Sequence, residues 1–71
     1  MSRDIFDEIG ERWPSAIVSR SEIGNFTGGM LSSKYLANLD SLGVGPKRVT
    51  IGRRVGYPVK DFVQWLRERR N

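Results

Sequence analysis

The sequence predicts a small α+β fold that is mostly helical, from the spacing of its apolar residues, from one alternating segment and from its length. Apolar residues recur at helical spacing in several segments, whereas residues 45–58, GPKRVTIGRRVGYP, alternate like a pair of antiparallel strands. The 71 residues are enough for one small domain, and we expect residues 1–71 to form it. The chain has no cysteine, so no disulfide supports it, and this composition suits a reducing cytoplasm.

The first predicted element is an N-terminal helix of about residues 3–11. Ser2 is its expected N-cap, and Gly10 and Pro14 bracket its end. Ile5, Phe6 and Ile9 recur at helical spacing, and Trp13 extends the same stripe beyond the helix. We interpret this element as a packing helix that enlarges the core of a small domain, rather than as a dimer-forming surface.

A second, shorter helix is predicted after an apolar run at residues 16–18. Ser19 and Glu22 have the spacing of a capping box, in which each side chain accepts a hydrogen bond from a free backbone N–H at the helix start. Ile23 and Phe26 form its expected inner face. Residues 27–29, TGG, end it, because glycine adopts positive φ without strain.

A third helix is expected to begin at an N-cap, Ser32, and to end at Gly43. Its expected inner face consists of Leu36, Leu39 and Leu42. The opposite face is small and polar, and it consists of Ser33, Lys34, Ala37, Asn38 and Ser41. An ordinary solvated surface would explain that face. A short helix, a glycine-containing turn and a helix with such a face are also typical of a helix-turn-helix.

The alternating segment predicts a β-hairpin, and its loop length follows from the apolar face. A two-residue turn at residues 52–53 would place Ile51 opposite Arg54 and mix charge into that face. We therefore predict a three-residue loop at residues 52–54, because register follows the buried side chains. The resulting pairs are Ile51 with Val55 and Val49 with Tyr57.

The hairpin is basic, and a closing helix follows it. Arg53 and Arg54 are expected at the exposed tip, and Lys47 and Arg48 near the open end. Pro58 fits the first turn of the last helix. The stripe of that helix consists of Val59, Phe62, Val63 and Leu66, with Trp65 on its flank. The expected core of the domain is Ile17, Ile23, Phe26, Leu36, Leu39, Val49, Ile51, Tyr57, Phe62 and Leu66.

Taken in order, these elements have the layout of a small winged helix-turn-helix, with a two- or three-stranded antiparallel wing and an extra N-terminal helix. Residues 1–30 carry a net charge of −2 and residues 31–71 a net charge of +6, which favours a nucleic-acid partner for the second part. A polar helix fits the major groove, and hairpin arginines suit phosphates or a narrow minor groove. The expected DNA-binding residues are Ser32, Ser33, Lys34, Tyr35, Asn38, Lys47, Arg48, Arg53 and Arg54.

Three segments, IVSRSEI, LSSKYLANLDSLGVGPK and IGRRVGYPVKDFVQWL, resemble the AlpA/excisionase family, which is related to the MerR DNA-binding domain. The resemblance covers residues 17–66, about 70% of the chain, and leaves residues 1–14 outside. It implies sequence-specific binding of double-stranded DNA by an excisionase or a transcriptional regulator of a mobile element. It also implies an integrase or another DNA-bound protein as a partner. By this resemblance, Ser33, Lys34 and Asn38 lie on the groove-facing helix and Arg53 and Arg54 in the wing.

Composition argues against several other classes of function. The chain has neither His nor Cys, so the commonest general base and metal ligand are missing, and we expect no enzymatic activity, no cofactor and no metal ion. Acids at helical spacing, interpreted as a solvated face, are Asp4, Asp7, Glu8 and Glu11. Duplex DNA is favoured over RNA because no aromatic-rich sheet is present. A protein-interaction module with the same winged fold is the alternative.

The setting of the protein is also an expectation. No apolar run approaches the roughly 20 residues that span a bilayer, so we expect no membrane partner. We expect a cytoplasmic protein that is associated with the nucleoid when bound to DNA. Because one such small domain has little room for specificity, we expect a monomer or a weak cooperative oligomer on DNA.

Overall fold

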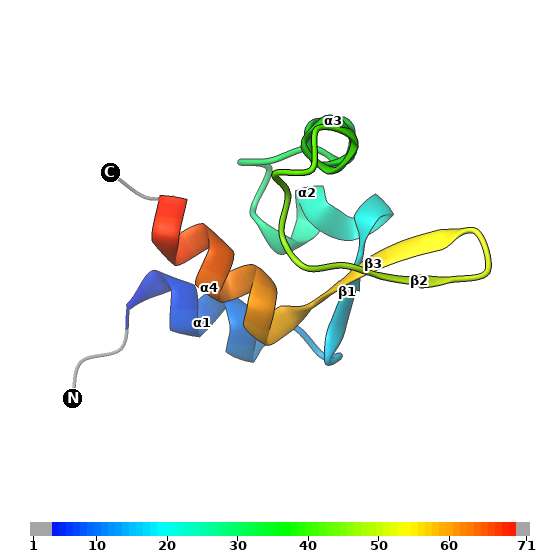
Figure 1. The fold of residues 1–71 in the computed structure, drawn as a ribbon. Helices are drawn as coiled ribbons and strands as arrows, with labels where there is room; N and C mark the ends of the chain where they lie inside the picture. The colour runs from blue at the N-terminus through cyan, green and yellow to red at the C-terminus, as the bar shows by residue number, and fades with distance from the viewer. Residues whose placement is uncertain (1–3, 70–71) are drawn as a thin grey trace.

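The computed structural model describes residues 4–69, and it confirms the predicted α+β, mostly helical fold. In chain order the elements are α1 (Ile5–Arg12), β1 (Ile17–Ser19), the 3₁₀ helix η1 (Arg20–Glu22), α2 (Ile23–Phe26), α3 (Ser33–Ser41), β2 (Val49–Ile51), β3 (Arg54–Pro58) and α4 (Val59–Arg69). In Figure 1, α1 and α4 lie side by side, α3 lies beyond α2, and the β2–β3 hairpin projects from the body. This is the layout of a winged helix-turn-helix with an added N-terminal helix.

The sheet has three antiparallel strands in the order β1-β3-β2. The third strand, one of the two alternatives that the sequence left open, is β1, whose residues 17–19 had not been assigned to a strand. It pairs Val18 with Tyr57 in the central strand, and both side chains are completely buried. The Val59 N–H donates to the Ala16 carbonyl across 2.8 Å and extends this pairing. Pro58 therefore ends β3, and α4 begins at Val59, one residue later than predicted.

The predicted three-residue hairpin loop is wrong. The structure pairs Ile51 with Arg54 and Val49 with Gly56, so the turn consists of Gly52 and Arg53 alone. Gly52 has a φ of 62°, and a glycine with positive φ at the first turn position is typical of a type II′ hairpin turn. The prediction failed because Ile51 is 73% exposed, so no buried face holds the register near the tip.

Phe62 of α4 lies at the centre of the core. It is completely buried, and its ring contacts those of Phe26, Tyr57 and Trp65 at centroid distances of 5.5, 5.4 and 5.6 Å. The buried apolar side chains are Val18, Ile23, Phe26, Leu36, Leu39, Tyr57, Val59, Phe62 and Val63. The core therefore joins β1 and β3 to α2, α3 and α4, and α1 packs against it with the half-buried side chains of Phe6 and Ile9.

Two residues of the predicted core are wrong, and two are less buried than expected. Ile17 is 37% exposed and Ile51 is 73% exposed. Neighbouring strand residues face opposite sides, so the burial of Val18 turns Ile17 outward. Val49 and Leu66 are half-buried. Leu42, expected on the inner face of α3, is 72% exposed because it follows the last helical turn.

The boundaries of α1 differ from the prediction at both ends. Asp4 is the N-cap and forms a capping box with Asp7, while the predicted cap, Ser2, lies outside the described residues. Gly10 lies inside the helix instead of ending it. A Cβ at position 10 would lie 3.2 Å from Val63 Cγ2, so glycine allows α1 to approach α4 closely.

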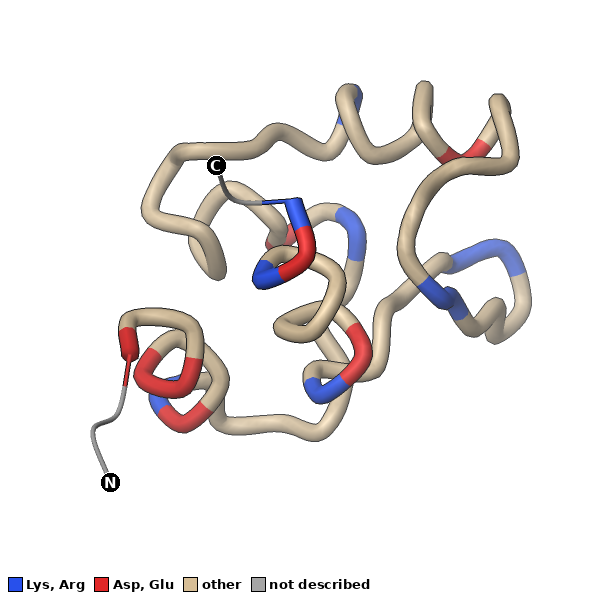
Figure 2. Tube along the Cα trace, turned by 60° about the vertical axis from the view of Figure 1, so that its left-hand side comes forward, with Lys and Arg blue, Asp and Glu red and all other residues tan. Residues whose placement is uncertain are grey.

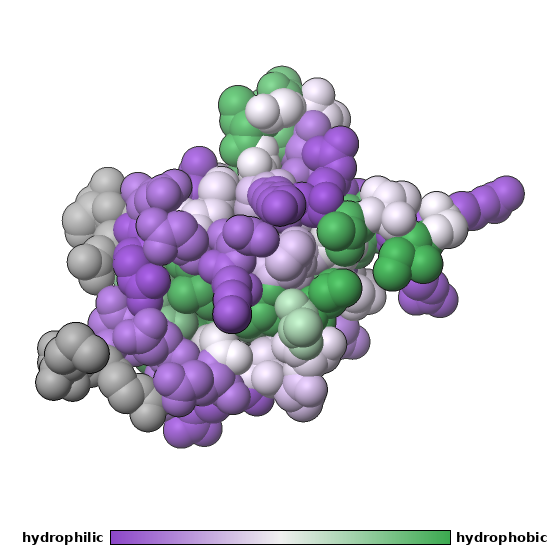
Figure 3. All heavy atoms as spheres, turned by 60° about the horizontal axis from the view of Figure 1, so that its bottom comes forward, coloured by the Kyte–Doolittle hydropathy of each residue, from purple (hydrophilic) through white to green (hydrophobic). Residues whose placement is uncertain are grey.

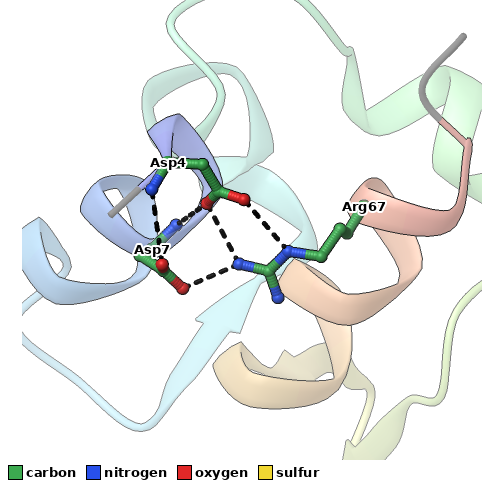
Figure 4. A network of polar contacts seen from close by, with 3 residues as sticks. All are labelled: Asp4, Asp7 and Arg67. Carbon is green, nitrogen blue, oxygen red and sulfur yellow. Dashed lines mark hydrogen bonds and ion pairs between the residues drawn. The ribbon is translucent and has the colours of Figure 1, made fainter. Parts of the chain in front are cut away.

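An arginine on α4 also binds the start of α1. The Arg67 guanidinium donates hydrogen bonds to Asp4 and Asp7, with Nη2 at 3.1 Å and 2.7 Å from their carboxylate oxygens (Figure 4). Chiefly through this hydrogen bond, Arg67 lowers the pKa of Asp4 from 3.8 to about 2. All three side chains are partly exposed, so water and salt weaken the attraction.

Thr27 organises the turn between the two helices of the helix-turn-helix. Its hydroxyl donates to the Ile23 carbonyl at 2.8 Å and accepts from the Leu31 N–H at 3.1 Å. Gly28 and Gly29 have φ of 65° and 86°, as predicted for the end of α2. The predicted capping box of Ser19 and Glu22 does not form, because the chain enters through a 3₁₀ turn and the Ser19 hydroxyl contacts Ser21 instead.

Both predicted ends of α3 are confirmed. The Ser32 hydroxyl accepts a hydrogen bond from the Tyr35 N–H at 3.1 Å. Gly43 has a φ of 75°, and the N–H groups of Gly43 and Val44 donate to the carbonyls of Asp40 and Leu39. These two bonds form a Schellman motif, which satisfies carbonyls at the helix end.

Candidate nucleic-acid interface

The outer face of α3 has the polar character that the sequence predicted. Ser33, Lys34 and Asn38 are exposed, and Ser32 is exposed at the N-cap. Leu36 and Leu39 fix the rotation of the helix by packing into the core. The face therefore presents hydroxyl, ammonium and amide groups, which can donate and accept at the edges of bases.

The hairpin tip is basic and exposed. Arg53 lies in the turn and Arg54 begins β3, and both side chains face solvent. Ile51 beside them is 73% exposed, and Figure 3 shows hydrophobic atoms next to the polar tip where the hairpin projects. The tip contributes nothing to the core, so its side chains are free to contact a partner.

Lys47 and Arg48 lie at the open end of the hairpin, before β2, and both are exposed. Arg48 Nη1 lies 3.7 Å from a carboxylate oxygen of Asp40. Arg48 therefore forms an ion pair with a carboxylate of its own chain, and in this it differs from the two arginines at the tip.

A groove of about 290 Å³ joins the start of α3 to the hairpin tip. Its lining residues are Ser19, Arg20, Ser21, Ser33, Arg53, Arg54 and Val55. They include three arginines and no carboxylate. The structure thus brings Ser33 together with Arg53 and Arg54, and the other predicted residues do not line this groove.

Sequence reasoning missed Arg20, which lines the same groove. Its Nε donates to the Tyr57 hydroxyl at 3.1 Å and its Nη2 to Asp40 Oδ2 at 2.5 Å. The pKa of Arg20 is raised above its ordinary value, chiefly by this hydrogen bond to Tyr57. Burial raises the pKa of Tyr57, and its own hydrogen bond to Asp40 raises it further. The available sequence signal was an arginine between two serines in SRSE, in a segment that had been assigned only to a helix cap.

Tyr35 lies on another side of α3. Its hydroxyl lies 3.2 Å from Arg69 Nη2 and accepts a hydrogen bond from it. It borders an apolar hollow of about 400 Å³ together with Met30, Trp65 and Leu66. Tyr35 does not line the groove at the hairpin tip, and its expected DNA contact stays a prediction because nothing in the structure tests it.

Charge is distributed unevenly over the molecule. Figure 2 shows that α1 carries a group of acidic residues and the hairpin carries basic ones. Within residues 4–69, no three His, Cys, Asp or Glu side chains are placed to hold a metal ion. No helix in that part of the chain is long and apolar enough to cross a membrane.

No protein-family model matches the chain, and no curated protein or solved structure matches it either. We therefore infer the function of the protein from its residues and their geometry.

Proposed function

We propose that this protein binds double-stranded DNA in a sequence-specific manner. The observation that carries the proposal is the groove shared by α3 and the hairpin tip, where Ser33, Arg53 and Arg54 meet without a carboxylate. A duplex offers the matching surface, since its phosphates flank a major groove wide enough for a helix. Acidic side chains gather on α1, so the molecule presents its basic hairpin to the polyanion (Figure 2).

In this proposal the two parts of the interface have different tasks. Lys34 and Asn38 on the exposed face of α3 contact base edges in the major groove. Arg53, Arg54 and Lys47 contact phosphates of the neighbouring backbone, which fixes register without adding sequence information directly. An arginine at the tip can also enter a narrow minor groove, where the negative potential is enhanced.

The test is binding to duplex DNA at several salt concentrations, followed by fluorescence anisotropy. We expect affinity for a random-sequence duplex to fall steeply as salt rises, because bound phosphates release counterions. Selection from a pool of random duplexes should then enrich one sequence, and that sequence should bind more tightly than the starting pool. Absence of duplex binding near 50 mM salt would contradict the proposal.

The resemblance to AlpA and excisionase proteins suggests the biological setting, a mobile element in a cytoplasm. Footprinting on DNA around its own coding region distinguishes the two roles. Protection across an attachment site favours an excisionase that acts beside an integrase. Protection across a promoter favours a transcriptional regulator.

A protein-interaction module is the second candidate, and one observation favours it. The hollow of about 400 Å³ between α1, α4 and the start of α3 has an apolar lining, and Met30 beside it is 83% exposed. Exposed apolar surface of this kind is more typical of contact with a protein than with phosphate. Duplex affinity that is weak and independent of salt would favour this candidate.

A further inference from the structure

The groove between η1, the start of α3 and the hairpin tip has one exposed cationic side and one cationic side that is held by hydrogen bonds. Arg53 and Arg54 form the exposed side, at the hairpin tip. Arg20 forms the held side. Its side chain is only 27% exposed, and two of its three guanidinium nitrogens have partners. A side chain held in this way loses little conformational entropy when it binds a ligand.

The contacts of Arg20 leave part of its guanidinium available. Tyr57 accepts from Nε and Asp40 accepts from Nη2, while no hydrogen bond from Nη1 is found among residues 4–69. An arginine presents its donors in a planar fork that suits phosphate oxygens. Three serine hydroxyls line the same groove and can donate to an anion: those of Ser19, Ser21 and Ser33.

Asp40 does not cancel the positive charge of this region. Its side chain is 5% exposed, and two cations lie close to its carboxylate, Arg20 at 2.5 Å and Arg48 at 3.7 Å. Its Oδ1 accepts no hydrogen bond from the described residues. A Cβ at Gly45 would lie 2.1 Å from that oxygen, so the backbone encloses the carboxylate on that side. Asp40 is therefore placed to hold Arg20, and a net positive charge remains.

We propose that this groove binds one phosphate of the DNA backbone, with Arg20 as its fixed contact and Asp40 and Tyr57 as the positioning residues that orient Arg20. The inference rests on the proposed function for its ligand, a phosphodiester, and it adds a contact from η1 to those of α3 and the hairpin tip. It also gives α3 a role beyond the major groove, since Asp40 belongs to α3.

The first test replaces phosphates of a bound duplex one at a time by neutral methylphosphonates. For the unmodified protein, one linkage should weaken binding about tenfold, the loss expected for a hydrogen bond to a charged group. The variant is Arg20→Gln with Asp40→Asn, which keeps an amide pair in place of the ion pair and leaves the net charge unchanged. In that variant, neutralising the same linkage should weaken binding no more than neutralising the neighbouring linkages does. A linkage effect that persists unchanged overturns the inference.

The second test separates orientation from charge. Tyr57→Phe removes only the hydroxyl that accepts from Arg20 and donates to Asp40. It should weaken binding severalfold and reduce the effect of that linkage, while the slope of log affinity against log salt stays the same because no charge is lost. Lys60→Gln, which removes an exposed cation on α4, is the control and should leave the linkage effect intact. A Tyr57→Phe variant with full affinity and an unchanged linkage effect overturns the positioning role.

A third measurement distinguishes failure of the site from failure of the proposed function. Inorganic phosphate is titrated into the full chain, and backbone amide shifts are followed by NMR. Saturable shifts at Ser19, Ser21 and Ser33 that disappear in the Arg20→Gln, Asp40→Asn variant support the anion site even if no duplex binds. Shifts elsewhere alone, or none, overturn it, whatever the duplex titration shows.

Discussion

The Tyr57 hydroxyl donates a hydrogen bond to Asp40 Oδ2 across 2.6 Å and thereby joins the central strand β3 to α3. Tyr57 is completely buried and Asp40 nearly so. Arg20 donates to both side chains, so three segments distant in sequence meet at one carboxylate. The orientation of α3 relative to the hairpin therefore depends on a polar contact as well as on apolar packing.

Replacing Tyr57 with Phe should destabilise the fold and flatten its dependence on high pH. Loss of the two hydrogen bonds should cost about 1–2 kcal/mol at neutral pH. Burial and the bond to Asp40 raise the pKa of Tyr57 above its ordinary value of 10.0, so they favour the neutral phenol in the folded state. That stabilisation is complete below pH 10.0 and is lost as pH rises through the raised pKa.

Chemical denaturation at several pH values measures this effect. The unmodified protein should lose stability more steeply than Tyr57→Phe above pH 10.0, because phenylalanine has no proton to release. Tyr35→Phe is the control, since Tyr35 is 39% exposed and its hydroxyl accepts from Arg69 at an exposed site. Parallel curves for the unmodified protein and Tyr57→Phe would show that the Tyr57 phenol does not contribute.

Phe62→Ala should cost about 3–5 kcal/mol, because it removes a completely buried ring and leaves a cavity. Four aromatic rings meet in this part of the core, and Phe62 contacts three of them. In a domain of 71 residues such a loss would unfold much of the population. Thermal melts followed by circular dichroism test it, with Gln64→Ala on the exposed side of α4 as the matched control. An unchanged melting temperature would contradict the central position of Phe62.

The contact between Arg67 and the start of α1 should weaken in acid. Arg67 holds the pKa of Asp4 at about 2, so the stabilisation is present above the ordinary value of 3.8 and is lost as pH falls toward 2. Asp4→Asn keeps a capping side chain but removes the charge. Between pH 4 and pH 2 the melting temperature of the unmodified protein should fall further than that of Asp4→Asn, and 1 M salt should reduce the difference. A difference insensitive to both pH and salt would assign the effect of Asp4 to capping alone.

Local signals in the sequence predicted much of this fold, and contacts between distant residues explain the errors. Ser32 and Gly43 were assigned correctly because caps depend on a few neighbouring residues. The predicted hairpin register was wrong because it assumed that Ile51 is buried and that Tyr57 pairs with Val49, whereas Ile51 is exposed and Tyr57 pairs with Val18 of β1. Alternation within the hairpin carries no information about that third strand.

In the candidate site too, local signals predicted some residues, whereas others depend on contacts between residues distant in sequence. The exposed face of α3 follows from helical periodicity, and the exposure of Arg53 follows from its place in a turn. Arg20 could not be assigned in this way, because its partners lie 20 and 37 positions away. Asp40 likewise resembles an ordinary helix-surface acid until the fold brings Arg20 to it. Partly buried ion pairs of this kind become visible only in the assembled structure.

Asn38→Ala should change specificity more than overall affinity. Asn38 is exposed on α3, where an amide can form a two-hydrogen-bond contact with adenine. Such a pair contributes about 1–3 kcal/mol of discrimination, so the ratio of affinities for the selected and the random duplex should fall about tenfold or more. Gln64→Ala, on the exposed side of α4, is the control and should keep the ratio. If Asn38→Ala weakens both duplexes equally, Asn38 does not read bases.

The double substitution Arg53→Ala, Arg54→Ala tests whether the hairpin tip contacts DNA. Both side chains are exposed and the turn depends on Gly52, so stability should stay within about 0.5 kcal/mol of the unmodified protein. Binding should respond strongly, because each lost phosphate contact removes roughly one released counterion. The slope of log affinity against log salt should therefore flatten by up to about two units.

The control for that variant is Arg12→Ala with Lys60→Ala, which removes two exposed cations from α1 and α4, away from the groove. Its salt slope should stay close to that of the unmodified protein, because long-range attraction between exposed charges is screened beyond about 10 Å at 0.1 M salt. Equal flattening in both variants would mean that binding responds to total charge rather than to the hairpin. If Arg53→Ala, Arg54→Ala melts like the unmodified protein and its slope of log affinity against log salt is unchanged, the tip does not touch DNA. The protein-interaction candidate would then gain support.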